Sequence, residues 1–385
     1  MSSVRKWAAS LSAFMLVCLL ALTLAGCGNN DAAEEEAPND AATETVVDEN
    51  ADRTFVDDAG REVTVPGVGV LEKIYFTSPN AQIYCFTLAP EMAAGSTMNF
   101  TEEELAYLPE GTADLPFLGT TSGGQELNPE AIMAEGVQLI FDITSFEPGE
   151  GDASSADDLQ AMTNIPVVVL DGSFAKSAEC YEKLGELLGK EAEAAKLADY
   201  TAKTLADVEA AVAKVPEDER VSVYYAEGPD GLSTEPSTSP HAEVFNLAGA
   251  VNVAADVEVQ KGKGMSPVPL EQILAWNPDV IIAWDSSRFE GGADDIIRTD
   301  PNWATIKAVE DGKVYSMPQS PFSWVDRPRA VNRIIGLEWL TNLLYPEYYD
   351  IDITANTIEF FDLFYHVDID EDDVKTILKE TYPEK

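Results

Sequence analysis

Residues 176–214 read KSAECYEKLGELLGKEAEAAKLADYTAKTLADVEAAVAK and contain no proline. Alanine, glutamate, lysine and leucine dominate this stretch, and all four favour helix. Its apolar side chains recur every three to four residues, which is the spacing of one helix face. They are Leu184, Leu187, Leu188, Leu197, Tyr200, Leu205, Val208 and Val212. The stretch predicts one or two long helices that end before Pro216.

Strand and helix patterns alternate on both sides of this helical stretch. Before it, the sequence predicts a helix at 80–88 and strands at 73–77, 138–143 and 166–170. After it, the sequence predicts helices at 241–247 and 330–344 and strands at 221–225, 280–284 and 313–316. The last helix is expected to be amphipathic, with Ile334, Ile335, Leu337, Leu340 and Leu344 inward. Such alternation favours the α/β class, with mainly parallel sheets under covering helices.

Two further patterns support a division into two lobes, at 53–175 and 215–385. Residues 54–66 read TFVDDAGREVTVP, which predicts two short strands around an Asp-Ala-Gly turn. Residues 126–140 and 268–282 each place a glutamate near a helix start, then an apolar helix and a buried strand. This weak internal repeat is expected when the two lobes have similar folds.

The chain has 385 residues, 24 Lys and Arg, 69 Asp and Glu, and a net charge of −45. So acidic a protein lacks the basic surface that nucleic acids and anionic lipid heads require. With 2 histidines and 4 cysteines, a His-rich metal cluster and a disulfide scaffold are excluded as well. The hydrophobic content of 45% is typical of a globular protein.

The first 52 residues predict export and anchoring. Arg5 and Lys6 precede an uncharged run that ends in Leu24-Ala25-Gly26-Cys27, which is similar to a bacterial lipobox. We expect residues 1–26 to be a signal peptide and Cys27 to carry diacylglycerol. Acyl chains contribute ~0.8 kcal/mol per buried methylene, so the protein would be held at the extracytoplasmic face of the membrane. A plain transmembrane anchor with a buried Cys27 is the alternative. Residues 27–52 are acidic, without bases, and predict a disordered tether.

Two cysteines, Cys85 and Cys180, remain in the folded part. An exported compartment permits a disulfide between them. Two separate buried thiols are the default expectation.

Three motifs together resemble a known family. They are the strand pair with its Asp-Ala-Gly-Arg turn after a lipobox, the segment LEQILAWNPDVII at 270–282, and GLEWL at 336–340 followed by Leu344-Tyr345-Pro346. In this combination the chain resembles substrate-binding lipoproteins of ABC importers for ferric siderophores, haem and cobalamin. The resemblance covers roughly residues 53–350.

The resemblance implies a monomer of two α/β lobes, joined by one long rigid helix at 176–214, with the ligand in the cleft between them. It implies a permease and its ATPase as partners, no cofactor and no chemistry. One acid on each lobe is implied to dock onto permease arginines, and Glu130 and Glu271 match those positions. Pro129 replaces the leucine that usually precedes the first of them. An acid favoured by the helix dipole is the plainer interpretation of each.

Candidate ligand residues on the first lobe follow predicted strands, because ligands gather at the carboxyl ends of strands. They are Ser78, Asn80, Thr121 and Ser122. Hydroxyl groups near helix N-termini suit an anion. Ordinary helix capping by these residues is the alternative.

Candidate ligand residues on the second lobe include three of the chain's scarce arginines. The set is Tyr225, His241, Trp284, Arg288, Trp324, Arg327 and Arg329. Arginine offers a fixed fork of donors to an anion, unless it pairs with an acid such as Asp326 or Asp285. His241 could bind a metal directly, donate to an anion, or simply pack or cap. The tryptophans would line the cleft or lie in the core.

Enzyme classes leave no recognisable motif in this sequence, which lacks Gly-x-Ser-x-Gly, His-Glu-x-x-His and a phosphate loop. A secreted hydrolase stays as the alternative from another class. For the ligand we favour an iron chelate, a ferric siderophore ahead of haem or cobalamin. Molybdate or tungstate is the alternative within the same architecture. A chelate needs a wide cleft with aromatic walls, whereas an oxyanion needs a small polar pocket closed by donors.

Overall fold

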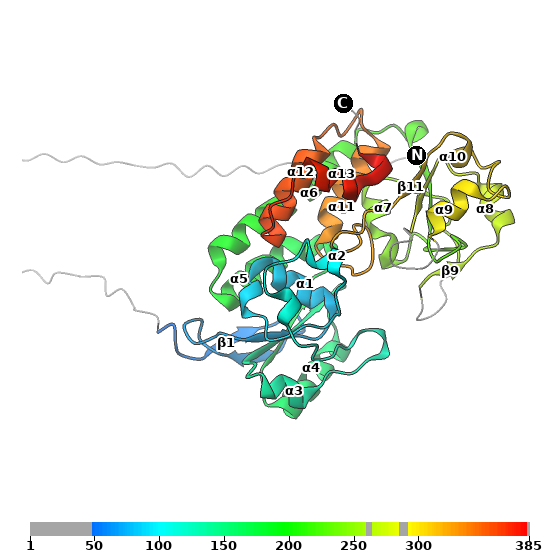
Figure 1. Cartoon of the computed structure of the whole chain (residues 1–385). Helices are drawn as coiled ribbons and strands as arrows, with labels where there is room; N and C mark the ends of the chain where they lie inside the picture. The colour runs from blue at the N-terminus through cyan, green and yellow to red at the C-terminus, as the bar shows by residue number, and fades with distance from the viewer. Residues whose placement is uncertain (1–47, 259–263, 285–291, 383–385) are drawn as a thin grey trace, which may run out of the picture. The chain divides into compact units, whose positions relative to one another are not determined.

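The structure is a computed structural model that describes residues 48–258, 264–284 and 292–382 (Figure 1). The predicted signal peptide, Cys27 and most of the predicted tether fall outside these residues. Residues 48–51 lie against the loop after β2, where the amide of Gly69 donates to the carbonyl of Glu49 at 2.9 Å. None of the described helices is both long and apolar enough to cross a membrane.

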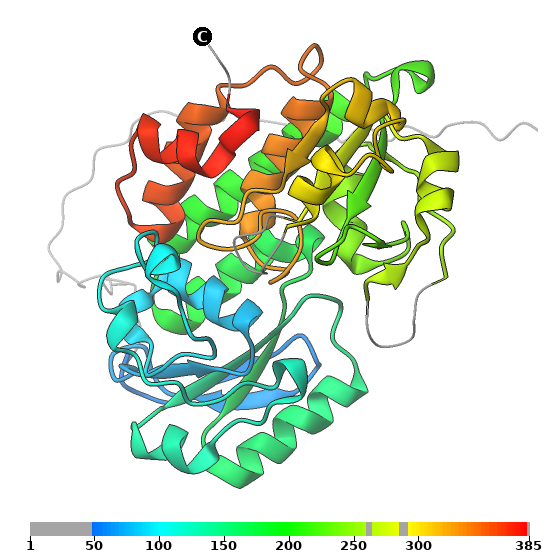
Figure 2. The same cartoon turned by 45° about the vertical axis from the view of Figure 1, so that its right-hand side comes forward.

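The first lobe is built on a parallel sheet in the order β3 (Ile74–Phe76), β4 (Leu139–Thr144) and β5 (Val167–Asp171). These strands are almost wholly apolar because helices cover both faces of the sheet. α1 (Pro79–Leu88) lies on one face, and α3 (Pro129–Ala134) and α4 (Glu150–Thr163) lie on the other (Figure 2). The short helix α2 (Glu102–Leu105) is part of the connection between α1 and α3.

The predicted strand pair is confirmed as the antiparallel hairpin of β1 (Arg53–Val56) and β2 (Glu62–Val65). Asp57 in its turn accepts hydrogen bonds from the backbone amides of Ala59, Arg61 and Val169, at 3.1, 2.8 and 3.1 Å. One buried carboxylate thus closes the turn and ties the hairpin to β5. Asp58, the Asp of the Asp-Ala-Gly-Arg motif, accepts a further hydrogen bond from the backbone amide of Asp171 at 2.8 Å.

Two helices form the connection between the lobes, α5 (Ser177–Leu188) and α6 (Glu191–Val212). Gly189 separates them in the left-handed conformation, with φ of 68°, which ends α5 as glycine commonly does. The helices pack against each other, and α6 also packs against α11 (Asn332–Leu344). The connection is therefore a helical pair with one long member.

The second lobe contains the parallel sheet β11 (Val314–Ser316), β10 (Val280–Ala283), β6 (Ser222–Ala226) and β8 (Val251–Asn252), in that order. A small antiparallel pair joins β7 (Ser233–Thr234) to β9 (Ser266–Pro267). The helices of this lobe are α7 (Glu243–Leu247), α8 (Leu270–Trp276), α9 (Ala293–Thr299) and α10 (Lys307–Glu310). The alternation predicted for both lobes is confirmed.

The helix predicted at 330–344 differs from expectation in its pattern of burial. In α11 the polar residues Asn332, Arg333 and Glu338 are buried together with the apolar ones. The helix is enclosed by α6, α7 and α12 (Ile353–Phe360), so an amphipathic interpretation is wrong. The Glu338 carboxylate accepts hydrogen bonds from Thr204 at 2.7 Å and Asn356 at 2.8 Å.

The C-terminal segment packs against the first lobe. After α12 the chain forms a π-helical turn, Phe361–Tyr365, and then α13 (Glu371–Leu378). The ring of Phe361 lies 5.6 Å from that of Tyr107, and the ring of Phe364 lies 5.9 Å from that of Tyr181. These aromatic contacts belong to one large apolar cluster that runs through the first lobe, α5, α6 and α11. Cys85 and Cys180 are buried in it as free thiols, which is the default expectation.

Candidate functional site

The loop between β11 and α11 carries three of the seven candidate ligand residues of the second lobe, Trp324, Arg327 and Arg329. It lies at the boundary with the first lobe, because Phe322 on the loop packs 6.3 Å from Phe100, centroid to centroid. At the loop's end the Arg333 guanidinium lies 4.7 Å from the ring centroid of Phe174, just after β5. Side chains from this loop can therefore face a ligand held between the lobes.

Arg327 on this loop is surrounded by carboxylates. Its guanidinium donates to Glu227 at 2.5 Å and to Glu235 at 2.9 Å, and it also pairs with Asp326. Glu227 directly follows β6 and Glu235 directly follows β7, so the ends of two strands deliver them. All three carboxylates are buried. The alternative in which Arg327 pairs with acids is the one that the structure shows.

One guanidinium cannot neutralise three buried carboxylates, so the excess negative charge favours the protonated form of one of them. Burial raises the pKa of Glu227 to about 8, and its neighbours Asp326 and Glu235 add to the rise while Arg327 opposes it. Burial would also raise the pKa of Glu235, but hydrogen bonds from the Met265 amide, Ser239 and Arg327 hold it below its usual value. The proton therefore resides on Glu227 at neutral pH.

His241 and Tyr225 complete this group of side chains. The Nδ1 atom of His241 contacts the Asp326 carboxylate, while its side chain stays 21% exposed. The hydroxyl of Tyr225 donates to Asp326 at 3.2 Å and accepts from the indole nitrogen of Trp284 at 2.8 Å. Arg327 also lies 5.7 Å from the centroid of the Trp284 ring. The Asp326 carboxylate thus orients the imidazole ring through Nδ1, so that the part-exposed ring has Nε2 as its second polar atom.

Arg329 is the cation of this loop that forms no ion pair with a carboxylate among the described residues. Its Nη1 atom is buried, and no described residue offers it a hydrogen bond. Burial lowers the pKa of Arg329, and the nearby guanidinium of Arg333 lowers it further. Arg333 itself is paired with Glu243 at 2.7 Å. A buried guanidinium nitrogen without an acceptor is costly, so this position favours an anion.

Four predicted ligand residues of the first lobe gather around the end of β3. Thr121 donates its hydroxyl to the carbonyl of Thr77 at 3.0 Å, and Ser78 caps α1 by accepting from the Ala81 amide at 3.3 Å. Ser122 directly follows Thr121, and Asn80 lies in the first turn of α1. Ser78 therefore performs the capping role that was its alternative.

One predicted residue of the second lobe, Trp324, does not join the site. It is fully buried in the core, and its indole donates to the carbonyl of Ser320 at 2.9 Å. Its neighbour Phe322 is 1% exposed, so neither ring provides a wall for a planar ligand. Arg288 lies outside the described residues.

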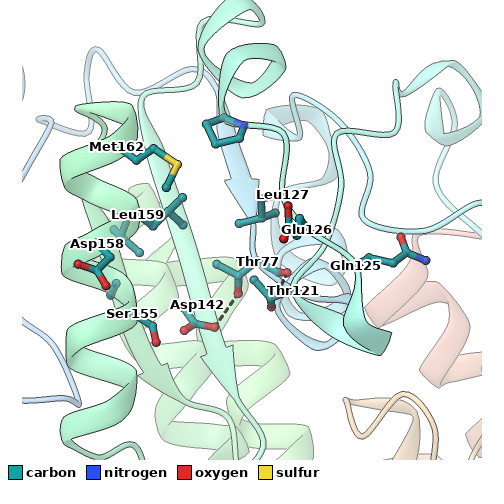
Figure 3. A pocket seen from close by; sticks show the side chains of 13 residues that line it. Thr77, Thr121, Gln125, Glu126, Leu127, Asp142, Ser155, Asp158, Leu159 and Met162 are labelled. Carbon is teal, nitrogen blue, oxygen red and sulfur yellow. Dashed lines mark hydrogen bonds between the residues drawn. The ribbon is translucent and has the colours of Figure 1, made fainter.

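A separate pocket of about 550 Å³ opens on the first lobe between α4, the 121–129 loop and the sheet (Figure 3). Leu127, Leu159 and Met162 supply its apolar wall, and Asp142 on β4 lies at its floor. The Asp142 carboxylate accepts from the Thr77 hydroxyl at 2.6 Å, and burial raises its pKa. Of the predicted ligand residues, Thr121 lines this pocket.

Sequence reasoning missed Glu227, Glu235 and Asp142 as parts of these sites. Each carried a signal: Glu227 follows a predicted strand, and Asp142 interrupts an otherwise apolar one. Glu235 follows a two-residue strand that has no periodicity to detect. Within the described ranges, no group of three or more His, Cys, Asp or Glu is arranged to hold a metal ion.

Comparisons with known proteins agree with this architecture. A family model described as periplasmic binding protein matches residues 120–321. The molybdate-binding protein MolA of Haemophilus influenzae is 30% identical over 265 residues, which span 62% of this chain and 70% of the relative.

Solved structures give the same picture. An ABC transporter solute-binding protein from Sulfurospirillum deleyianum is 31% identical, with a TM-score of 0.75 over 85% of this chain and 99% of that chain. The TroA-like protein FepB from Veillonella parvula is 22% identical, with a TM-score of 0.66 over 82% of this chain and 97% of that chain. The second likeness concerns the fold alone.

Proposed function

The chain belongs to the periplasmic binding protein family, and we propose that, as the solute-binding component of an ABC importer, it captures a tetrahedral oxyanion of the molybdate class. The family places it outside the cytoplasm. Its role is to bind and deliver the solute rather than to transform it.

The buried, unpartnered Nη1 of Arg329 carries the choice of an oxyanion. A dianion beside this nitrogen would supply the missing acceptor and offset the repulsion between Arg329 and Arg333. His241, held by Asp326, adds a second donor at the same boundary between the lobes. MolA, the 30% identical relative, is named for molybdate binding, which supports the same ligand class.

The iron chelate favoured by the sequence has less support from this site. That expectation depended on aromatic walls, and Trp324 and Phe322 are buried in the core. It depended also on free arginines, and Arg327 is already paired with three carboxylates. Among the predicted aromatic residues, Trp284 is part-buried and lies beside the guanidinium of Arg327.

Isothermal titration with molybdate, tungstate, sulfate, ferric siderophores and haem tests the proposal. We expect saturable binding of molybdate and tungstate. Arg329→Gln should weaken it by about 1.5–3 kcal/mol, the range for hydrogen bonds to charged groups. Arg298→Gln is the matched control, because that guanidinium already pairs with Asp294 and Glu380 and should leave affinity unchanged.

Tight binding of a ferric chelate with no heat from either oxyanion would reverse the choice of ligand. Equal molybdate affinity in wild type and Arg329→Gln would remove Arg329 from the site.

We infer docking to the permease through Glu130 and Glu271. Both are exposed acids in the first turn of a short helix, α3 and α8 respectively. Anchoring through Cys27 is proposed from the sequence. Cys27→Ala should leave the precursor uncleaved and without lipid, which metabolic labelling with a fatty acid would report.

A further inference from the structure

We propose that the pocket between α4 and the 121–129 loop is a second ligand site, which binds a small organic cation: a guanidinium or primary ammonium group on an apolar stem. The residues that line this pocket do not include Arg329, His241 or Asp326, and the inference does not depend on the identity of the transported solute.

The floor of the pocket provides the contact for the charged head. Asp142 is the one charged residue of β4, whose other residues are apolar or carry a hydroxyl, and it is part-buried. The hydroxyl of Thr77, at 2.6 Å, is the hydrogen-bond partner that the structure gives it. A carboxylate can accept about four hydrogen bonds. Most of its acceptor capacity is therefore left for a ligand with several N–H donors.

The walls of the pocket determine the rest of the ligand. Leu127 and Leu159 face each other across it, and Met162 forms the outer edge although it is 63% exposed (Figure 3). These side chains suit an aliphatic stem of several carbons. The volume of about 550 Å³ matches a small molecule, since ligand pockets span roughly 300–1,000 Å³.

The sign of the ligand's charge follows from the remaining lining groups. Glu126 and Asp158 stand at the rim, and among the described lining residues there is no Lys, Arg or His. An anion would meet three carboxylates and no donor cation. A cation on an apolar stem meets a partly buried carboxylate at the floor, the acids at the rim and apolar walls between them.

Butylguanidinium is the probe for this site, and the ε-methyl NMR signal of Met162 is the reporter. We expect a saturable shift of that signal with butylguanidinium and with butylammonium. The apparent Kd should fall from methylguanidinium to butylguanidinium, because the stem adds apolar contact with Leu127 and Leu159. Asp142→Asn should weaken binding at least tenfold, whereas Glu62→Gln, an exposed carboxylate outside the pocket, should not.

Several outcomes would overturn the inference. If uncharged 1-butanol shifts the Met162 signal as strongly as butylguanidinium does, the site does not select charge. If all stem lengths bind alike in the wild-type protein, the apolar walls take no part. The far-UV circular dichroism spectrum and thermal unfolding of Asp142→Asn verify that the variant is folded. A molybdate affinity equal to that of wild type would separate the two sites.

Discussion

A single guanidinium faces three buried carboxylates at the end of β6, and this imbalance makes the stability of the protein depend on pH. Burial raises the pKa of Glu227 to about 8. In the unfolded chain a glutamate titrates near pH ~4.3. Between these two values the folded protein holds one proton more than the unfolded chain. The stability gained from this proton is complete below the lower value and is lost as pH rises through the upper one.

Glu227→Gln should therefore lose part of this pH dependence, because glutamine keeps the uncharged form at every pH. Between pH 5 and pH 9, wild type should lose stability relative to the variant, with a slope of up to about 1.4 kcal/mol per pH unit. Scanning calorimetry at a series of pH values measures the difference. The exposed acid Glu209 gives the control, Glu209→Gln, which should follow wild type. Parallel curves for wild type and Glu227→Gln would contradict the assignment of the proton.

Residues of the candidate site could be predicted from the sequence where they follow the end of a strand. Their hydrogen-bond and ion-pair partners could not, because these come from distant parts of the chain. Tyr225, His241 and Arg327 were predicted for one site, and the structure brings them together around Asp326. The pairing of Arg327 with Glu227 and Glu235 joins residues about a hundred positions apart, a distance at which spacing carries no information.

At the scale of elements, the motif Gly336-Leu337-Glu338 has a steric explanation. α11 crosses the 318–325 loop so closely that a Cβ atom on Gly336 would lie 1.7 Å from the carbonyl oxygen of Trp324. The backbone must move to admit any side chain there. Overpacking of this kind costs about 1–3 kcal/mol, which exceeds the roughly 1 kcal/mol that alanine gains over glycine within a helix.

Gly336→Ala should thus lower the free energy of unfolding by about 1–2 kcal/mol, as measured from the midpoint and slope of urea denaturation. Gly151→Ala is the matched control within α4, because a Cβ atom there meets nothing within 4 Å. That variant should be as stable as wild type or slightly more stable. A Gly336→Ala protein with unchanged stability would show that the loop yields without cost.

Elements with a periodic apolar pattern were predicted, and those without one were missed. The three strands of the first sheet, the strands β6, β10 and β11 of the second, and the pair α5–α6 agree with the sequence to within a few residues, whereas the two-residue strand β8 was not predicted. α4 reads EGDASSADDLQAMT, in which few apolar residues mark a helix face, and it was not predicted. It forms because it packs on β5, a tertiary contact that overrides weak propensity. Because α4 also forms one wall of the second pocket, that pocket could not be predicted from the sequence.

At the scale of the whole molecule, the exposed residues Glu130 and Glu271 predict which surface of the protein binds the permease. The double variant Glu130→Arg, Glu271→Arg should abolish solute uptake by cells while leaving solute affinity in titration unchanged. Each surface ion pair contributes only ~0–1 kcal/mol, but opposed charges set the register and rate of association. Reversal of two other exposed acids, Glu62→Arg and Glu209→Arg, controls for the change in net charge. Normal uptake by the first double variant would exclude this docking pair.

The arrangement of lobes was predictable because it follows from the order of elements along the chain. The role of the C-terminal segment was not, because the contacts of Phe361 with Tyr107 and of Phe364 with Tyr181 join distant parts of the sequence. The aromatic residues of this segment pack on the first lobe and on α5, while Glu380 at its end accepts a hydrogen bond from the backbone amide of Ser316 on β11. The segment therefore contacts both lobes, which limits how far they can separate.

The attachment of Arg53 has a mechanical consequence. Its guanidinium donates to the carbonyls of Glu186 and Leu187 at the end of α5, at 2.8 and 2.5 Å, beside the break between α5 and α6. A force applied to the chain before β1 is therefore transmitted to the folded protein next to the break between α5 and α6, which connect the lobes. Its lever arm about that break is short, so tension along the chain exerts little torque on either lobe. Tension on the membrane tether would therefore not separate the two lobes.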